Sequence, residues 1–194
     1  PELNKGLKAK IMSFFMTYGR LGSDAEIVIN VQGDAPLIPP WVIGGVAGTL
    51  RADPSLQMAT PAIELPAETE TRMRADKAKG SASGTTVVFN KAMDAMYFSK
   101  NVIPFRRKAG EGAPAYQHIG LYGYRRDTLE QLVALDPTPF ELTESLEQLR
   151  ALENGIPIRV VLTDYRGRSA WSVDAPEDAV RVEDIIAREG ELVE

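Results

Sequence analysis

Two aspartates follow segments that we expect to be strands, and both have the chemistry to hold a metal ion. Asp34 comes after the apolar run 28–31, separated from it by Gln32 and Gly33, and Asp174 ends the segment Ala-Trp-Ser-Val before a helix. If the strands are parallel, their carboxyl ends meet where open α/β sheets bind ligands. Two carboxylates there would suit Mg²⁺ and substrate phosphates. Alternatively, Asp34 caps a turn and Asp174 caps a helix.

The single histidine, His118, lies in the segment Tyr-Gln-His-Ile-Gly-Leu-Tyr-Gly-Tyr. Strand alternation places His118, Gly120, Tyr122 and Tyr124 on one face. Because glycine permits close approach to the backbone, Gly120 indicates room for a ligand beside the rings. The alternative is a hydrogen-bonded core histidine packed against tyrosines. A metal site based on His118 is not expected without further histidines or any cysteine.

The elements that must position these residues alternate between strands and helices. We expect strands at 27–31, 57–63, 116–124 and 158–163, a hairpin of 85–89 with 95–99, and helices at 1–20, 39–51, 127–135, 142–155 and after 174. Asp127 and Glu130 resemble a capping box. The pattern predicts one α/β domain with a largely parallel sheet and an antiparallel hairpin excursion.

Three segments leave their interpretation open. The polar stretch 64–84 is a solvated loop or a mobile lid. The amphipathic helix at 1–20 faces the core or, because of its lysines, a membrane surface. Glu144, Glu147 and Gln148 fall off the leucine face of the helix at 142–155, where polar residues usually form only a solvated side.

The composition excludes several classes of function. A net charge of −5 and a pI near 5.1 argue against a nucleic-acid surface. The sequence contains no cysteine, no apolar run long enough to span a bilayer and no signal-peptide pattern. Phosphate-binding and nucleophile-elbow glycine motifs are also missing. We therefore expect a mildly acidic, cytoplasmic protein that does not bind a membrane.

Five ordered blocks resemble the 3-deoxy-manno-octulosonate (Kdo) cytidylyltransferases, or CMP-Kdo synthetases. The blocks are VINVQGDAPLIPP, AMYFSKNVIPF, QHIGLYGYR, ESLEQLRALENG and WSVDAPEDAVRVEDI, spanning roughly residues 25–187. The resemblance implies a Rossmann-like nucleotidyltransferase fold, a single domain over 1–194 and a homodimer formed through the hairpin region. It also implies Mg²⁺-dependent transfer of CMP from CTP to Kdo, with release of pyrophosphate, for lipopolysaccharide synthesis.

The resemblance also assigns roles to residues. Asp34 and Asp174 would be the catalytic carboxylates that hold Mg²⁺ against the CTP phosphates, where charge builds up during transfer. The residues implied around the sugar are Gln32, Gly33, Ser99, Arg107, His118, Tyr122, Glu147 and Gln148. Ser99 and Arg107 are the weaker candidates among them.

Three features depart from the family pattern. Ala35 stands where the family usually has an acid, and residues 83–86 replace a common asparagine and lysine. Nothing matches the family's opening strand and its basic loop, which grips the triphosphate and cytosine. We therefore expect an N-terminally incomplete member with poor CTP affinity and an exposed edge beside strand 28–31. Two other readings remain: a transferase for another acid sugar, and an inactive paralogue that serves as a binding or assembly partner.

Overall fold

The computed structural model describes residues 25–33, 35–108, 111–170, 173 and 176–191, with 176 and 177 described for their backbone alone. The expected helix at 1–20, Asp34 and Asp174 lie outside the described residues. The strands are β1 (Ile27–Val31), β2 (Met58–Glu64), β3 (Thr86–Phe89), β4 (Ala95–Ser99), β5 (Tyr116–His118), β6 (Leu121–Arg125) and β7 (Ile158–Leu162). The helices are α2 (Pro40–Ala52), α3 (Ala67–Ala78), α4 (Arg126–Ala134), α5 (Pro139–Glu144), α6 (Gln148–Glu153) and α7 (Pro176–Glu189).

The strands form one sheet that is mostly antiparallel. Six follow the order β1-β6-β2-β5-β3-β4, and β7 pairs with β2. β6 is antiparallel to β1 and β2, and β5 is antiparallel to β2 and β3. Among the described strands, the one parallel pairing joins β2 to β7. The expectation of a mostly parallel sheet is therefore wrong, whereas the α/β combination and the antiparallel β3–β4 hairpin are present.

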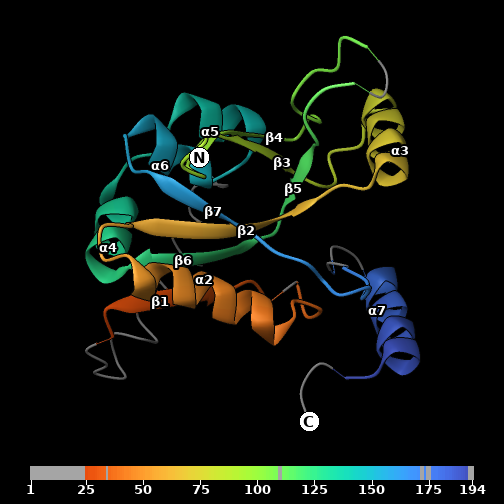
Figure 1. Ribbon diagram of the computed structural model, residues 1–194, viewed down its shortest axis with the longest axis horizontal. Coiled ribbons are helices and arrows are strands. Elements are labelled where there is room, and N and C mark those ends of the chain that lie inside the picture. Colours follow the sequence, from red (N-terminus) through yellow and green to blue (C-terminus); the bar gives the residue numbers. More distant parts are fainter. Residues whose placement is uncertain (1–24, 34, 109–110, 171–172, 174–175, 192–194) are drawn as a thin grey trace.

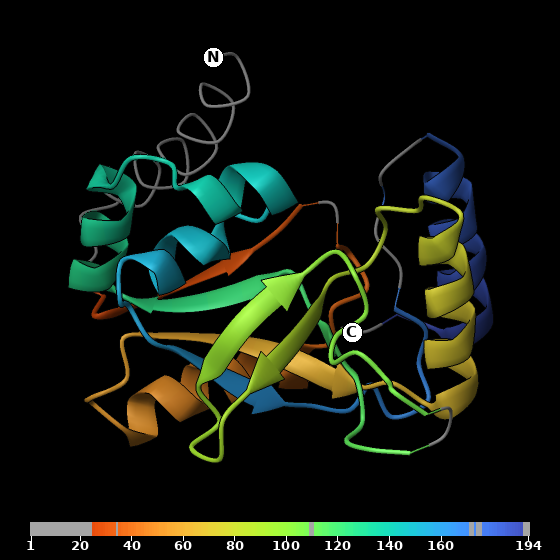
Figure 2. The same ribbon diagram turned by 90° about the horizontal axis from the view of Figure 1, so that it is seen from above.

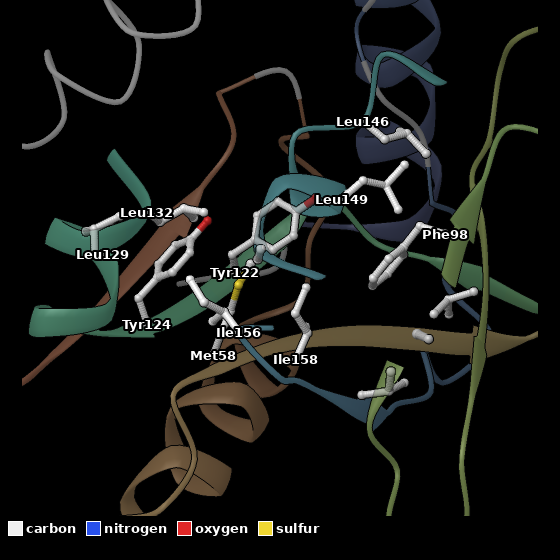
Figure 3. Close-up of a cluster of buried hydrophobic side chains, with 14 of the residues drawn as sticks. Met58, Phe98, Tyr122, Tyr124, Leu129, Leu132, Leu146, Leu149, Ile156 and Ile158 are labelled. Atoms are coloured by element: carbon white, nitrogen blue, oxygen red, sulfur yellow. The ribbon is translucent and has the colours of Figure 1, made fainter. Parts of the chain in front are cut away.

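Helices cover both faces of this sheet (Figures 1 and 2). On one face, α2 packs Val42, Val46 and Leu50 against the sheet. On the other face, α4 and α6 enclose a larger cluster around Met58 and Tyr122 (Figure 3). α3 and α7 instead lie beyond one end of the sheet in both views. The helices packed on the two faces stabilise the sheet. α3 and α7 stand beyond its end, where a cleft opens.

Local geometry differs from the sequence expectations at several points. Most of the expected loop or lid at 64–84 is helix α3. The expected helix at 142–155 is two short helices, because Ser145 between them has a left-handed backbone with φ 54°. The strand expected at 116–124 is interrupted after His118. α4 begins after Arg125 with no side-chain cap, so the predicted capping box at Asp127 is wrong.

Candidate active site

A cleft of about 1340 Å³ opens at this end of the sheet. Its wall is made by residues from β2, β5, β6, α3, α5, α6, α7 and the loops between them, including the loop that follows β1. The sequence-predicted residues in the wall are Gln32, His118, Gly120, Tyr122, Glu147 and Gln148. Segments far apart in the sequence therefore meet around one cavity, which is large enough for a small-molecule substrate.

His118 ends β5 and is 9% exposed at the cleft wall. Its Nε2 lies 2.9 Å from the Thr60 hydroxyl, and its ring meets Phe98 edge-on at 5.1 Å between centroids. Burial, with a smaller contribution from the Lys100 charge, lowers the pKa of His118 to about 3. The imidazole is therefore neutral at physiological pH.

Gln32 and Gly120 meet where β1 ends and the β5–β6 strand breaks. A Cβ at residue 120 would lie 2.6 Å from the Gln32 side-chain oxygen, which is too close for any real contact. The space left by Gly120 is therefore occupied by the amide of Gln32, and the glycine fixes where that amide can lie. The sequence pattern had predicted that a ligand, not the Gln32 side chain, would use the space beside Gly120.

Glu147 and Gln148 enter the cleft wall at the start of α6. Gln148 is only 2% exposed, and its Nε2 has no hydrogen-bond partner among the described residues. This amide nitrogen is enclosed by the protein, so its missing partner is a local cost in free energy. Burial and the nearby charge of Glu147 raise the pKa of Tyr122 well above its ordinary value, which keeps its phenol protonated.

A buried ion pair supports these two residues from behind. The Glu141 carboxylate accepts hydrogen bonds from Nε (2.8 Å) and Nη2 of Arg150, and both side chains are almost fully buried. This bidentate arrangement joins α5 to α6 and raises the pKa of Arg150 further. It fixes the helix start from which Glu147 and Gln148 project.

Glu144 connects α5 to the end of β4. One carboxylate oxygen accepts a hydrogen bond from the Ser99 hydroxyl, and the other accepts one from the Lys100 backbone, both at 2.8 Å. Ser99 is thus used in a structural contact and does not line the cleft, whereas the following residue, Lys100, does. The sequence analysis named Ser99 and missed Lys100, although both stand beside the same segment.

α3 forms the opposite wall and is tied to neighbouring loops by charged side chains. Glu70 accepts hydrogen bonds from Arg74 (2.9 Å) and Arg106 (2.7 Å), and Arg74 also donates to the Val102 carbonyl. Lys77 donates to the carbonyls of residues 83 and 84, which line the cleft. Arg107, in contrast, is exposed and lies outside the cleft wall, as does Gly33.

Asp34 and Asp174 lie outside the described residues, but their neighbours are brought together. Leu37 and Val173 belong to one cluster with Val182 and Ile185 of α7. Residues close in sequence to the two aspartates therefore contribute to one apolar cluster. Among the described residues alone, no group of three metal-ligating side chains occurs.

The family described as cytidylyltransferase matches residues 12–160. A 3-deoxy-manno-octulosonate cytidylyltransferase from Maricaulis maris is 92% identical over 174 residues, covering 90% of this chain and 67% of the relative. A relative of the same name from Rhodopseudomonas palustris is 47% identical, covering 79% of this chain and 57% of its own.

Solved structures agree with this family. A CMP:2-keto-3-deoxy-manno-octonic acid synthetase complexed with CTP superposes with a TM-score of 0.75 at 33% identity, covering 90% of this chain and 67% of its own. An inositol-1-phosphate CTP transferase from T. maritima, with a TM-score of 0.51 at 12% identity, covers 94% of this chain and 63% of its own and shares the fold alone. The fold and the matched residues thus define a nucleotidyltransferase of the cytidylyltransferase class. More narrowly, the chain belongs to the 3-deoxy-manno-octulosonate cytidylyltransferase family.

The chain spans about two thirds of the length of the curated relatives that it matches. No helix among the described residues is long and apolar enough to cross a membrane.

Proposed function

We propose that the protein transfers CMP from CTP to Kdo, producing CMP-Kdo and pyrophosphate for lipopolysaccharide synthesis. The observation that carries the proposal is the 92% identity with the Maricaulis maris relative over 90% of this chain. In this reaction the anomeric hydroxyl of the sugar loses its proton and attacks the α-phosphorus of CTP. The bond from that phosphorus to pyrophosphate breaks, and negative charge builds up on phosphate oxygens.

The cleft has the side chains that an acid sugar requires. Gln32 offers an amide, and His118 offers a neutral ring at the wall. Lys100 supplies a positive charge in the same wall, suited to the carboxylate of the sugar acid. Binding the sugar against these groups would hold its hydroxyl in line with the α-phosphorus, and such positioning supplies a large part of a rate enhancement.

Asp34 and Asp174 are the residues proposed to hold Mg²⁺. The cluster to which both Leu37 and Val173 contribute supports this assignment, because each of them lies within three residues of one of the aspartates. Two carboxylates are the protein ligands that Mg²⁺ usually takes beside substrate phosphates. When bound, the ion would neutralise charge on the phosphate oxygens.

We also propose a homodimer and a cytoplasmic location. The family resemblance places the dimer contact in the β3–β4 hairpin region, where Met96 on β4 is 64% exposed and so accessible to a partner subunit. Sedimentation of the wild type and of Met96→Glu tests it: a wild-type monomer at micromolar concentration would contradict the dimer. The use of CTP, an intracellular nucleotide, supports the location.

The deciding experiment measures Mg²⁺-dependent pyrophosphate release from CTP in the presence of Kdo. It is run on this chain and on the chain joined to the part of the Maricaulis maris relative that it does not cover. Asp34→Asn and Asp174→Asn should abolish release, whereas Arg51→Ala at the exposed end of α2 should leave it unchanged. Release with another acid sugar and not with Kdo would reassign the substrate. No release from either protein would favour the inactive paralogue.

A further inference from the structure

The interruption between β5 and β6 turns two backbone carbonyls toward the buried hydroxyl of Thr60. Thr60 Oγ1 lies 2.8 Å from the carbonyl oxygen of Leu121 and 3.4 Å from that of Ile119, and the residue is fully buried. A hydroxyl has one proton, and two oxygens at 2.8 Å repel each other unless a proton lies between them. The Thr60 proton is therefore committed to a carbonyl.

The hydrogen bond that the Thr60 hydroxyl donates to a carbonyl determines which nitrogen of His118 carries the proton. Its Nε2 lies 2.9 Å from the same Oγ1, which can now only accept. A neutral imidazole carries one N–H, so the proton is on Nε2 and Nδ1 keeps its lone pair. Among the described residues Nδ1 has no hydrogen-bond partner, and it is not one of the enclosed atoms, so it faces the cleft.

We infer that Thr60 is a positioning residue that holds His118 as its Nε2–H tautomer, so that Nδ1 accepts a hydrogen bond from a hydroxyl of the sugar. The second half of this inference rests on the proposed function. The Nδ1 lone pair binds a hydrogen-bond donor and repels a carboxylate. The imidazole would therefore recognise a hydroxyl of the sugar. The acid group of the sugar would then lie away from the ring, on the Lys100 side of the cleft.

The surroundings keep the ring neutral and oriented. Phe98 and Tyr122 contact the imidazole, with ring centroids 5.1 and 5.4 Å away. Burial and the Lys100 charge disfavour the imidazolium form. With its pKa this low, His118 is a poor base for the attacking hydroxyl at neutral pH, and its contribution is recognition.

Because the sequence contains one histidine, ¹⁵N-histidine labelling reads this ring without assignment. At pH 7 the wild type should show a protonated Nε2 and an unprotonated Nδ1. Thr60→Val keeps the shape but removes the acceptor, so the Nδ1–H form should appear. Thr60→Ser keeps the hydroxyl and should restore the wild-type spectrum. A wild-type Nδ1–H tautomer, or no change in Thr60→Val, would overturn the role of Thr60.

The ligand half is tested by adding Kdo together with CTP and Mg²⁺. Saturation should shift the Nδ1 resonance, and Thr60→Val should raise the KM for Kdo about tenfold, the worth of one ordinary hydrogen bond, with little change in kcat. An unmoved Nδ1 resonance would overturn the hydroxyl contact. The tautomer is read without turnover. Failure of both this chain and the joined chain to release pyrophosphate would therefore contradict the proposed function, while the role of Thr60 is still decided.

Discussion

The two sides of the cleft are both held by a carboxylate paired with arginine, but the pairs differ in burial. On the α5–α6 side, Glu141 and Arg150 have side chains that are only 6% and 3% exposed. On the α3 side, Glu70 is as well buried at 7%, but its partners Arg74 and Arg106 are 28% and 19% exposed. The ion pair on the α5–α6 side is shielded from solvent, whereas the arginines on the α3 side are partly exposed to it.

The pairs also differ in what they join. Glu141 and Arg150 are nine residues apart and tie together adjacent helices. Glu70 and Arg106 are 36 residues apart and tie α3 to a distant loop. We conclude that the α5–α6 side is a fixed support for Glu147 and Gln148, whereas the α3 side is held by weaker, longer-range contacts and is expected to loosen first.

The largest expected effect is on the buried pair. Arg150→Met leaves Glu141 buried without its cation, so the free energy of unfolding should fall by about 3 to 5 kcal/mol. Urea unfolding of the purified chain measures this. The double variant Glu141→Leu/Arg150→Met removes both charges and should recover much of the loss. If Arg150→Met costs no more than the Glu70 variant below, the contrast between the two sides fails.

For Glu70→Gln we expect a smaller decrease in the free energy of unfolding, about 1 to 2 kcal/mol. This lies between the values for exposed and for buried ion pairs. This effect depends on pH. Hydrogen bonds from Arg106, together with those from Arg74, lower the pKa of Glu70 from 4.5 to about 2. The unfolded chain therefore takes up the proton first as the pH falls, so the contribution of Glu70 is complete above pH 4.5 and is lost between about 4.5 and 2.

Unfolding curves of wild type and Glu70→Gln at pH 6 and pH 3 test this dependence. The difference between the two proteins should shrink at pH 3. An equal difference at both pH values would show that the carboxylate charge is not what holds α3.

Next in size is Lys77→Met. The Lys77 ammonium donates to the carbonyls of Ser83 (2.6 Å) and Gly84 (2.8 Å), and methionine keeps the chain length but donates nothing. We expect a loss of about 1 kcal/mol and faster proteolysis confined to residues 79–85. Cleavage that stays at the wild-type rate would show that Lys77 does not order this part of the α3 side.

The smallest effect is expected for Lys79→Ala. Its ammonium lies 3.9 Å from Asp76, and both side chains are mostly exposed. Such pairs contribute at most about 0.5 kcal/mol, so unfolding in urea should match the wild type within error. A loss comparable to that of Glu70→Gln would mean that exposure does not explain the difference between the sides.

The sequence predicts where most strands lie along the chain, but not whether neighbouring strands in the sheet are parallel or antiparallel. The helix α2 carries the chain from β1 to β2 as a crossover would, and both strands point the same way because each is antiparallel to β6. The pattern of strand, helix and strand is therefore correct locally. It cannot show that β6, which begins more than 50 residues after β2 ends, enters between β1 and β2. Strand order depends on long-range pairing that no local periodicity records.

The helix α3 was missed for another reason. Within it only Glu70 is buried, so the apolar period that indicates an amphipathic helix is absent. Its residues are nevertheless strong helix formers, mainly alanine, glutamate, arginine and lysine, and this propensity was the available signal. The opposite error occurred at 142–155, where a leucine repeat predicted one helix. Leu142 is 65% exposed, and the left-handed Ser145 ends α5.

The residues named around the sugar came from ordered motifs, and the structure gathers five of them, together with Gly120, in one cleft wall. Their supports could not be predicted in the same way. Thr60 lies in a buried strand and is marked by no motif, and Glu141 looks like an ordinary surface acid on a helix. Each acquires its role from a partner elsewhere in the chain: Thr60 from His118 and the carbonyls of Ile119 and Leu121, Glu141 from Arg150.

The close approach of Gln32 to Gly120 also restricts how this protein can evolve. The Cβ of an alanine at 120 would lie 2.6 Å from the Gln32 side-chain oxygen, so the amide would have to turn out of the space that it now fills. A shorter residue at 32 leaves a gap but no collision. A library that varies both positions should therefore recover alanine at 120 more often with serine, alanine or glycine at 32 than with glutamine.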